Sequence, residues 1–262
     1  MGSATTQALA ASTEALAAAK GVTLETAGEL FAAARLIGET SQLSGALADP
    51  AAPASARAAV ITTVFSGASA TVQEALAVVA AQRWSSAADL VDGIEELAIR
   101  AAASGEPSSD IESELFAVSR IVAENPELEL ALGSRLGDGA AKSALIERLL
   151  TGKVGAASAL IVSSLVRDPR ERRVRQLLSR AMRIVSAQRG RIVATVHTAS
   201  PLTAEQSARL GESLSRRYGA QVSLNQVIDS SVVGGLRVQV ADDVIDGSIS
   251  ARLADLRQKL AG

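Results

Sequence analysis

The chain lacks several residues that catalytic and metal sites commonly use. Its 262 residues include no cysteine, one histidine and only 2% aromatic residues. Without cysteine the chain has no disulfide, no thiolate metal ligand and no cysteine nucleophile. With abundant alanine and so few aromatic side chains, we expect closely packed helices that have little bulk to line a deep ligand pocket.

Charge and hydropathy exclude further classes of protein. The formal net charge is -2, so no global field attracts nucleic acid or anionic lipid. No run of about 18 apolar residues is present, and we expect no transmembrane helix. The opening residues, MGSATTQALAAS, have neither the basic nor the apolar region of a secretory signal, and we expect none.

The first hundred residues predict a bundle of amphipathic helices. Thr23 is placed to cap one helix, in which apolar residues recur at three- and four-residue spacing until the break at Asp49–Pro53. Further helices are predicted over residues 5–20, 55–65, 72–82 and 88–103. The loop Gly105–Ser109 is a candidate boundary.

The segment after this loop repeats the one before it. Glu29–Glu39 (ELFAAARLIGE) and Glu114–Glu124 (ELFAVSRIVAE) align at an offset of 85 residues. Two alanine-rich amphipathic helices can resemble each other by chance, but the agreement continues across loops and further helices, which favours an internal duplication. Further along, the alignment shifts by one residue to a shorter offset, and the equivalent pairs there include Leu90 with Val174 and Ile94 with Leu178.

The periodicity changes after residue 190. The β-branched run at 191–198 predicts a strand. Thr203 and Gln206 form a capping box for a helix that Gly219 would end. The rest predicts strands over 221–228, 232–240 and 244–245 and a final amphipathic helix over 249–260.

The predicted architecture is therefore mainly α. We expect an N-terminal helical bundle over residues 1–105 and a second, repeat-related helical bundle over 106–190. A small α+β domain of order β-α-β-β-α would follow over 191–262.

No constellation of residues predicts a reaction. The Gly-Lys pair at 152–153 is followed by valine, which a phosphate-binding loop does not allow. His197 lies in a predicted strand and is better interpreted as an outward polar residue than as a base or metal ligand. Asp242, Asp243 and Asp246 are close together, but turns favour aspartate for backbone reasons. We expect no catalytic, cofactor-binding or metal site.

The strongest charge feature is the segment Arg167–Arg191, which contains nine arginines. One interpretation is contact with nucleic acid. No aromatic residue is interleaved for stacking on bases, so we favour a solvated or partner-facing helix and expect an acidic protein helix as its partner. On a helical wheel the apolar residues share a face, and the arginines expected to point away from it are Arg172, Arg175, Arg180 and Arg183.

Two C-terminal motifs carry a resemblance to a known family. Asp229–Val238 (DSSVVGGLRV) and Asp243–Ile249 (DVIDGSI), with Thr198–Thr203 (TASPLT) upstream, resemble the signature of F-type ATP synthase delta subunits. These subunits are the counterparts of the mitochondrial oligomycin-sensitivity-conferring protein. The resemblance covers Arg191–Leu260 and is looser in the helical part. We interpret the signature residues as mainly architectural, because glycine and aspartate set turns and close backbone approaches: Asp229, Gly234, Gly235, Asp246, Gly247 and Ser248.

The resemblance implies a non-catalytic subunit of the peripheral stalk. In this family the helical domain holds the N-terminal segments of the alpha subunits, and the C-terminal domain holds the C-terminal region of the b subunit. The implied place is the cytoplasmic face of the cell membrane, peripheral to it, with no cofactor and no nucleic acid.

The apparent second bundle departs from the usual family pattern of one bundle. In this respect the chain is similar to extended actinobacterial members. An alternative function is that of a helical adaptor or nucleic-acid-binding regulator that uses the basic face Arg167–Arg191.

Overall fold

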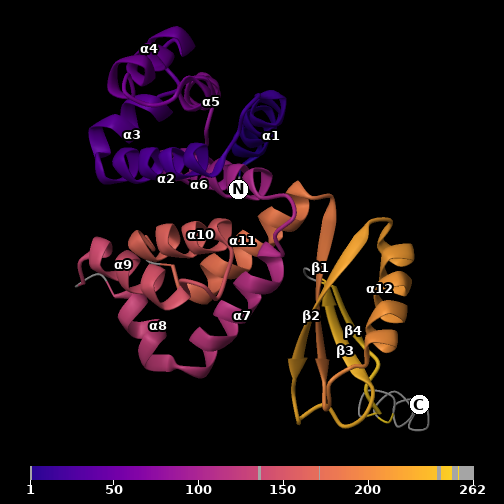
Figure 1. Ribbon diagram of the computed structural model, residues 1–262. Coiled ribbons are helices and arrows are strands. Elements are labelled where there is room, and N and C mark those ends of the chain that lie inside the picture. Colours follow the sequence, from indigo (N-terminus) through magenta and orange to yellow (C-terminus); the bar gives the residue numbers. More distant parts are fainter. Residues whose placement is uncertain (1, 135–136, 171, 241–242, 250–252, 254–262) are drawn as a thin grey trace. The chain divides into compact units, whose positions relative to one another are not determined.

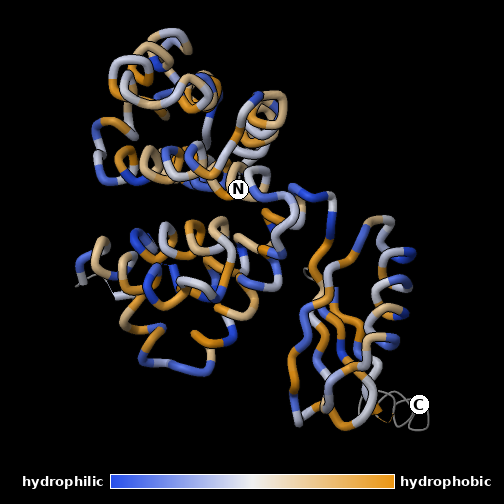
Figure 2. Tube along the Cα trace, viewed as in Figure 1, coloured by the Kyte–Doolittle hydropathy of each residue, from blue (hydrophilic) through white to orange (hydrophobic). Residues whose placement is uncertain are grey.

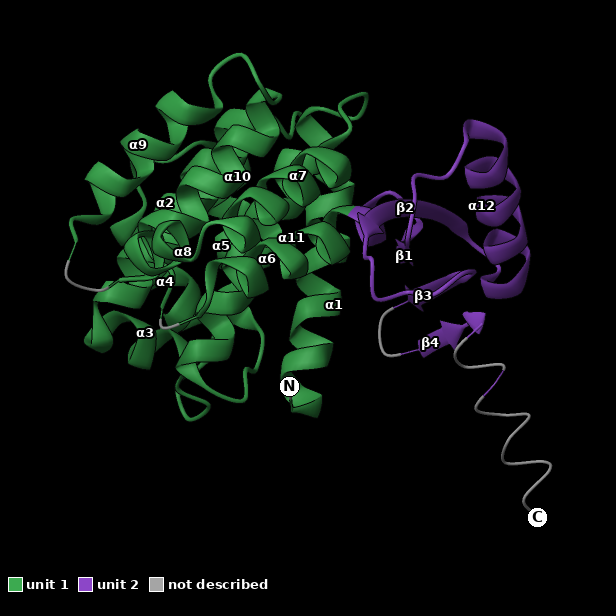
Figure 3. Cartoon of the chain, turned by 90° about the horizontal axis from the view of Figure 1, so that it is seen from below, with its two compact units in different colours: residues 1–185 green, residues 186–262 purple. Residues whose placement is uncertain are grey.

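The computed structural model describes residues 2–134, 137–170, 172–240, 243–249 and 253. Contacts divide the chain into two compact units, Met1–Val185 and Ser186–Gly262 (Figure 3). The first unit is helical and the second is a small α+β unit, which confirms the predicted fold class. The sequence places this boundary after residue 190, whereas the contacts place it five residues earlier, inside a helix.

The first unit consists of helices that follow one another through short loops (Figure 1). They are α1 (Ser3–Ala18), α2 (Leu24–Glu39), α3 (Ser41–Ala48), α4 (Ala54–Val64), α5 (Ala70–Ala81), α6 (Ala87–Gly105), α7 (Ile111–Glu124), α8 (Pro126–Gly133), α9 (Gly139–Leu150), α10 (Ala156–Arg167) and α11 (Val174–Gln188). The last helix continues into the second unit. None of the helices in the described ranges is long and apolar enough to cross a bilayer.

Side-chain caps begin several of these helices. Thr23 Oγ1 accepts a hydrogen bond from Thr26 N at 3.4 Å, and Thr26 Oγ1 accepts one from Thr23 N at 3.2 Å. Ser86 Oγ accepts from Asp89 N at 3.1 Å at the start of α6. Such bonds satisfy amide groups that the first turn of a helix leaves unpaired. The cap predicted at Thr23 is confirmed.

The helices after α1 form two sets of five with the same order. Each helix of the set α7–α11 begins 85 to 87 residues after its counterpart in α2–α6. Leu30 and Leu115 are both fully buried, and so are Leu47 and Leu132. The last two helices of the second set begin 86 and 87 residues after their counterparts. The residues paired by the predicted slip, Leu90 with Val174 and Ile94 with Leu178, are all buried.

A carboxylate caps the fourth helix of each set in the same way. Glu29 Oε2 on α2 accepts hydrogen bonds from Ser69 N at 2.9 Å and Ser69 Oγ at 2.8 Å, and Ser69 is the N-cap of α5. Glu114 Oε2 on α7 accepts from Gly155 N at 3.0 Å, and Gly155 is the N-cap of α10. A negative charge at a helix N-terminus is favourable. This equivalent contact supports the predicted duplication.

One continuous hydrophobic core runs through both sets of helices. Trp84 belongs to this core and donates a hydrogen bond from Nε1 to the carbonyl oxygen of Val79 at 2.8 Å. Its indole lies against Gly93 on α6, where a Cβ would come within 2.6 Å of Cζ3. Glycine at this position therefore makes room for the only tryptophan of the chain.

Gly93→Ala is expected to destabilise the first unit. Alanine is the better helix former by about 1 kcal/mol, but overpacking a filled core typically costs about 1–3 kcal/mol. Gly28 on α2 is the matched control, because a Cβ there has no neighbour within 4 Å. Gly28→Ala should raise the free energy of unfolding in urea, and Gly93→Ala should lower it. An equal gain for both variants would contradict the packing described for Gly93.

The second unit contains a four-stranded sheet of order β2-β1-β3-β4. Its elements are β1 (Arg191–Thr198), α12 (Ala204–Tyr218), β2 (Gln221–Ile228), β3 (Leu236–Val240) and β4 (Asp243–Asp246). The crossover through α12 makes β1 and β2 parallel, and the other pairs are antiparallel. Leu214 of α12 packs with Ala194, Val196 and Val238 in a separate core. Figure 2 shows hydrophilic residues along the outer side of α12.

The predicted limits of β1, α12 and β2 agree with the structure. The capping box is confirmed, since Thr203 Oγ1 accepts from Gln206 N and Gln206 Oε1 accepts from Thr203 N, and Gly219 ends α12 in the left-handed conformation. The third strand begins at Leu236 rather than at residue 232. The final helix predicted over 249–260 lies outside the described residues except at Ile249 and Leu253.

Candidate functional site

The described residues contain no group of three or more His, Asp or Glu side chains arranged to hold a metal ion. His197 lies on β1 and is half-buried, with Nδ1 3.7 Å from Asp229 Oδ2. Asp243 accepts a hydrogen bond from the Tyr218 hydroxyl. Neither contact places a nucleophile beside a base. The candidate sites are therefore the signature region of the second unit and the arginines of α11.

Asp229 of the signature closes a turn at the end of β2. Its Oδ1 accepts hydrogen bonds from Ser231 N at 2.9 Å and from Ser231 Oγ at 2.6 Å, and its own N donates to Thr198 O at 2.8 Å. The bond from the Ser231 hydroxyl lowers the pKa of Asp229, because it favours the ionised carboxylate. The residue thus fixes the backbone of its own turn.

Asp246 forms the matching turn after β4. Its Oδ1 accepts from Ser248 N at 2.9 Å, and the hydrogen bond from the Ser248 side chain lowers the pKa of Asp246. The two turns then join: Gly247 N donates to Leu236 O at 2.9 Å, and Ile249 N donates to Gly234 O at 3.2 Å. The two motifs of the signature are therefore one structural feature, held backbone to backbone.

The glycine pair permits this close approach. Gly234 and Gly235 have φ of 65° and 76°, in the left-handed region that favours glycine. A Cβ on Gly235 would overlap the carbonyl oxygen of Gly247 and lie 3.1 Å from the Cα of Ser248. The same φ values prevent the pair from continuing a strand, which explains why β3 begins only at Leu236.

Gly235→Val is expected to destabilise the second unit more than Gly219→Val does. Both glycines have left-handed φ, 76° and 69°, so backbone strain of about 1–2 kcal/mol applies to each. A Cβ at Gly219 meets no atom within 4 Å, whereas a Cβ at Gly235 collides with backbone. Segment-resolved amide hydrogen exchange should show a larger loss of protection in β1–β3 for Gly235→Val. Equal losses would refute the steric role of Gly235.

Arg180 of α11, together with Arg170 and Arg172 just before this helix, belongs to a buried ion cluster that joins two parts of the first unit that are distant in sequence. Glu95 on α6 has a side chain only 7% exposed. Its Oε1 accepts from Arg172 Nη1 at 2.9 Å and Arg180 Nη1 at 2.8 Å, and its Oε2 accepts from Arg172 Nη2 at 2.8 Å. Arg170 also pairs with Glu95, and its Nη1 lies 2.9 Å from Asp92 Oδ1.

The outward orientation predicted for Arg172 and Arg180 is therefore wrong. Their side chains are 24% and 19% exposed and turn towards the carboxylate of Glu95. A helical wheel counts hydrophobicity alone, so it cannot show a buried carboxylate on another helix that attracts arginine inward. Arg175 and Arg183 are exposed, and their contact with a partner stays a prediction.

Burial and ion pairing act on Glu95 in opposite directions. Burial alone raises the pKa of Glu95, but the hydrogen bond from Arg172 and the charges of the neighbouring arginines outweigh it, so the pKa lies below the ordinary value. For Arg172, burial lowers the pKa and the bond to Glu95 raises it, with a net increase. Both groups are therefore charged at neutral pH.

Glu95→Gln should lower the free energy of unfolding by about 3 kcal/mol at neutral pH, because the substitution leaves buried arginines without their counter-charge. Since folding lowers the pKa of Glu95, its contribution is complete above the ordinary value of 4.5 and is lost as the pH falls through the depressed pKa. The difference between the two proteins should thus be constant at neutral pH and shrink in acid. Trp84 fluorescence during urea unfolding measures it.

Glu124→Gln is the matched control for this measurement. Glu124 pairs with Arg120 at 2.8 Å, but the two side chains are 62% and 40% exposed. An exposed pair of this kind contributes less than about 1 kcal/mol. A Glu95→Gln variant as stable as the control would contradict the role of the buried cluster.

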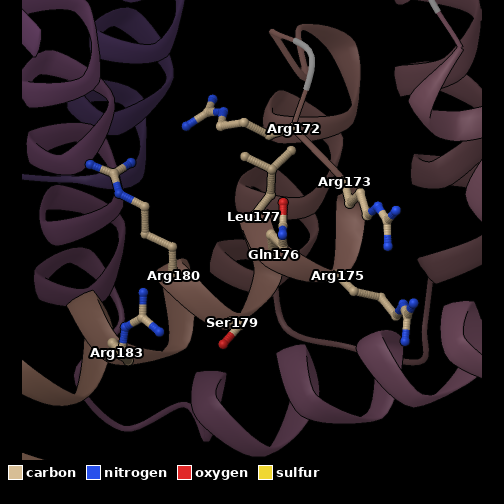
Figure 4. A pocket seen from close by; sticks show the side chains of 8 residues that line it. All are labelled: Arg172, Arg173, Arg175, Gln176, Leu177, Ser179, Arg180 and Arg183. Atoms are coloured by element: carbon tan, nitrogen blue, oxygen red, sulfur yellow. The ribbon is translucent and has the colours of Figure 1, made fainter. Parts of the chain in front are cut away.

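The sequence interpretation did not single out Glu95, the carboxylate at the centre of this cluster, or the neighbouring Arg173. Arg173 precedes α11 and is exposed along the same surface as Arg175 and Gln176 (Figure 4). The signal for Glu95 was present in the sequence, because three carboxylates interrupt the apolar pattern of a long helix at Asp92, Glu95 and Glu96.

Comparisons with known proteins agree on one family. The family model described as ATP synthase delta (OSCP) subunit matches residues 97–260. The ATP synthase subunit delta of Leifsonia xyli subsp. xyli is 49% identical, with 100% of both chains covered. The subunit delta of Streptomyces avermitilis is 40% identical over 91% of this chain and 89% of that protein. The subunit delta of Nocardia farcinica is 38% identical over 94% and 93%.

A solved structure gives a weaker likeness. A chain of the Toxoplasma gondii mitochondrial ATP synthase hexamer aligns with 63% of this chain and 97% of its own length, at 20% identity and a TM-score of 0.38. The family assignment therefore rests on the family model and the sequence relatives.

Proposed function

Because the chain belongs to the family of ATP synthase delta (OSCP) subunits, we propose that it joins the catalytic head of an ATP synthase to the b subunit of the peripheral stalk. Family membership makes the chain a structural subunit of that stalk and not a catalytic one. The finer proposal is that the helical unit holds N-terminal segments of the alpha subunits, and that the α+β unit holds the C-terminal region of b. The chain would then lie at the cytoplasmic face of the cell membrane.

The observation that carries this proposal is the division of the chain into two units with separate cores. Two units with separate cores can present two separate docking faces, one for each partner. Linking both faces in one chain raises the effective concentration of each partner for the other. That property suits a strut that resists the torque of the rotor while proton flow drives ATP synthesis.

We further infer that the helical unit is a duplicated bundle whose copies share α6. In the first copy α1 packs against α5 and α6, and in the second copy α6 packs against α10, the counterpart of α5. The helix α6 therefore ends one bundle and begins the next. The helix α1 buries only Thr5, Ala8, Ser12 and Leu16, whereas its counterpart α6 also packs along α2 and buries most of its residues. The leading helix of the first copy is therefore more exposed than that of the second. We propose that the first copy holds the alpha segments.

Deletion of partner segments tests this assignment. The chain should bind an alpha-beta head that has intact alpha N-terminal segments, and lose that binding when those segments are removed. It should bind b and lose that binding when the C-terminal region of b is removed. Each deletion should leave the other interaction unchanged, as measured by co-purification with the full chain.

The alternative function, that of a nucleic-acid-binding regulator, predicts a different result in binding experiments. A nucleic-acid-binding regulator would bind DNA or RNA at physiological ionic strength, with an affinity that falls as salt rises. Binding to nucleic acid together with indifference to both deletions would contradict the stalk assignment. The net charge of -2 and the pairing of Arg172 and Arg180 with Glu95 leave few arginines free for phosphate.

A further inference from the structure

A basic groove runs along α11 and onto α8. Along α11 it forms a hollow of about 580 Å³ lined by arginines, with Gln176 and Ser179 between them (Figure 4). A second hollow of about 710 Å³ continues beside α8, lined by Pro126, Leu130 and Gly133. Arg172 and Arg173 line both hollows, so the two hollows adjoin at these residues. We call this surface the α8–α11 groove.

The charge of the groove is only partly neutralised within the chain. Arg172 and Arg180 pair with Glu95, and Arg175 Nε lies 2.8 Å from Glu129 Oε2. Arg173 and Arg183 are exposed, and neither has an ion-pair partner among the residues that the structure describes. Within the described part of the chain, these two positive charges are therefore not compensated by an ion pair, although the net charge of the chain is slightly negative.

The spacing of these two arginines selects an elongated ligand. Arg173 lies just before α11, and Arg183 lies nine residues after the first residue of that helix, which corresponds to about 14 Å along its axis. A single phosphate or carboxylate cannot contact both, whereas a helix with acidic residues about three turns apart can.

The α8 end of the groove adds an apolar contact. Leu130 has an exposed fraction of 73%, the highest among the large apolar residues described as exposed. Among the described residues, no aromatic side chain lines either hollow, so these residues offer no platform for stacking a base. An apolar residue beside positive charges fits an amphipathic helix with acidic flanks better than a nucleic acid.

We propose that the α8–α11 groove binds an acidic amphipathic helix of another ATP synthase subunit, with Arg173 and Arg183 contacting its carboxylates and Leu130 its apolar face. This inference rests on the proposed function for the presence of that subunit. It assigns a docking surface to the second set of helices, apart from the surface of α1 and α5 proposed above for the alpha segments.

The absence of cysteine from the chain allows a direct test. Gln176→Cys places one thiol within the groove and leaves its arginines intact. The variant is labelled with a benzophenone maleimide, assembled into the purified synthase and irradiated, and the adduct is identified by mass spectrometry. We expect one main adduct, to a segment with net negative charge and apolar residues at helical spacing.

Charge reversal then tests the chemistry of the contact. In the Gln176→Cys background, Arg173→Glu with Arg183→Glu should reduce the adduct about tenfold. Replacing the acidic residues of the identified segment by lysine should restore it. The matched control is Arg209→Glu with Arg216→Glu on α12, where both arginines are exposed and lie near glutamates of their own helix. This control should leave the adduct unchanged.

The outcomes separate this inference from the proposed function. If the chain co-purifies with the synthase but the label finds no subunit, or finds a basic segment, the groove assignment is wrong and the stalk function stands. The same holds if charge reversal leaves the adduct unchanged. If the chain fails to co-purify, the stalk function itself is contradicted. Binding of a labelled single-stranded oligonucleotide to the free chain, lost on charge reversal, would overturn the acidic-helix assignment.

Discussion

The first unit depends on the neutralisation of one buried carboxylate. Glu95 lies within α6, among side chains that otherwise form the hydrophobic core, and a lone charge there would be strongly unfavourable. Its counter-charges come from beyond α10: Arg172 and Arg170 in the loop before α11, and Arg180 within α11. Arg170 has a left-handed φ of 45°, which is uncommon for a residue other than glycine. The ion cluster thus fixes the end of the helical series to its middle, so the two sets of helices act as one body.

This constraint bears on how the helical unit would carry load. Two sets of helices joined by a flexible linker would bend, whereas the sets α2–α6 and α7–α11 have one continuous core. The same helix that carries Glu95 therefore serves both sets. In the second unit the corresponding constraint is the joining of two turns, where Gly235 meets Gly247 backbone to backbone. In a protein that is not an enzyme, signature residues can thus be those that form turns and close backbone contacts.

Local signals in the sequence predicted much of this structure. The capping residues Thr23 and Thr203 and the stop at Gly219 act within one turn of chain, so their effect could be read directly. The break between α2 and α3 at Thr40 was missed, although Gly38, Thr40 and Ser41 are residues that favour a turn. The inward turn of Arg172 and Arg180 was also missed, since it depends on a partner 77 and 85 residues away. The signature residues were correctly located, but their contact across two turns became visible only in three dimensions.

The central claim is that the chain couples the head of an ATP synthase to its membrane sector. The most direct measurement is proton pumping by membrane vesicles during ATP hydrolysis, before and after removal of the chain. The account predicts that hydrolysis continues while pumping is lost, and that adding the purified chain back restores pumping. Pumping that persists at full rate in vesicles free of the chain would contradict the account.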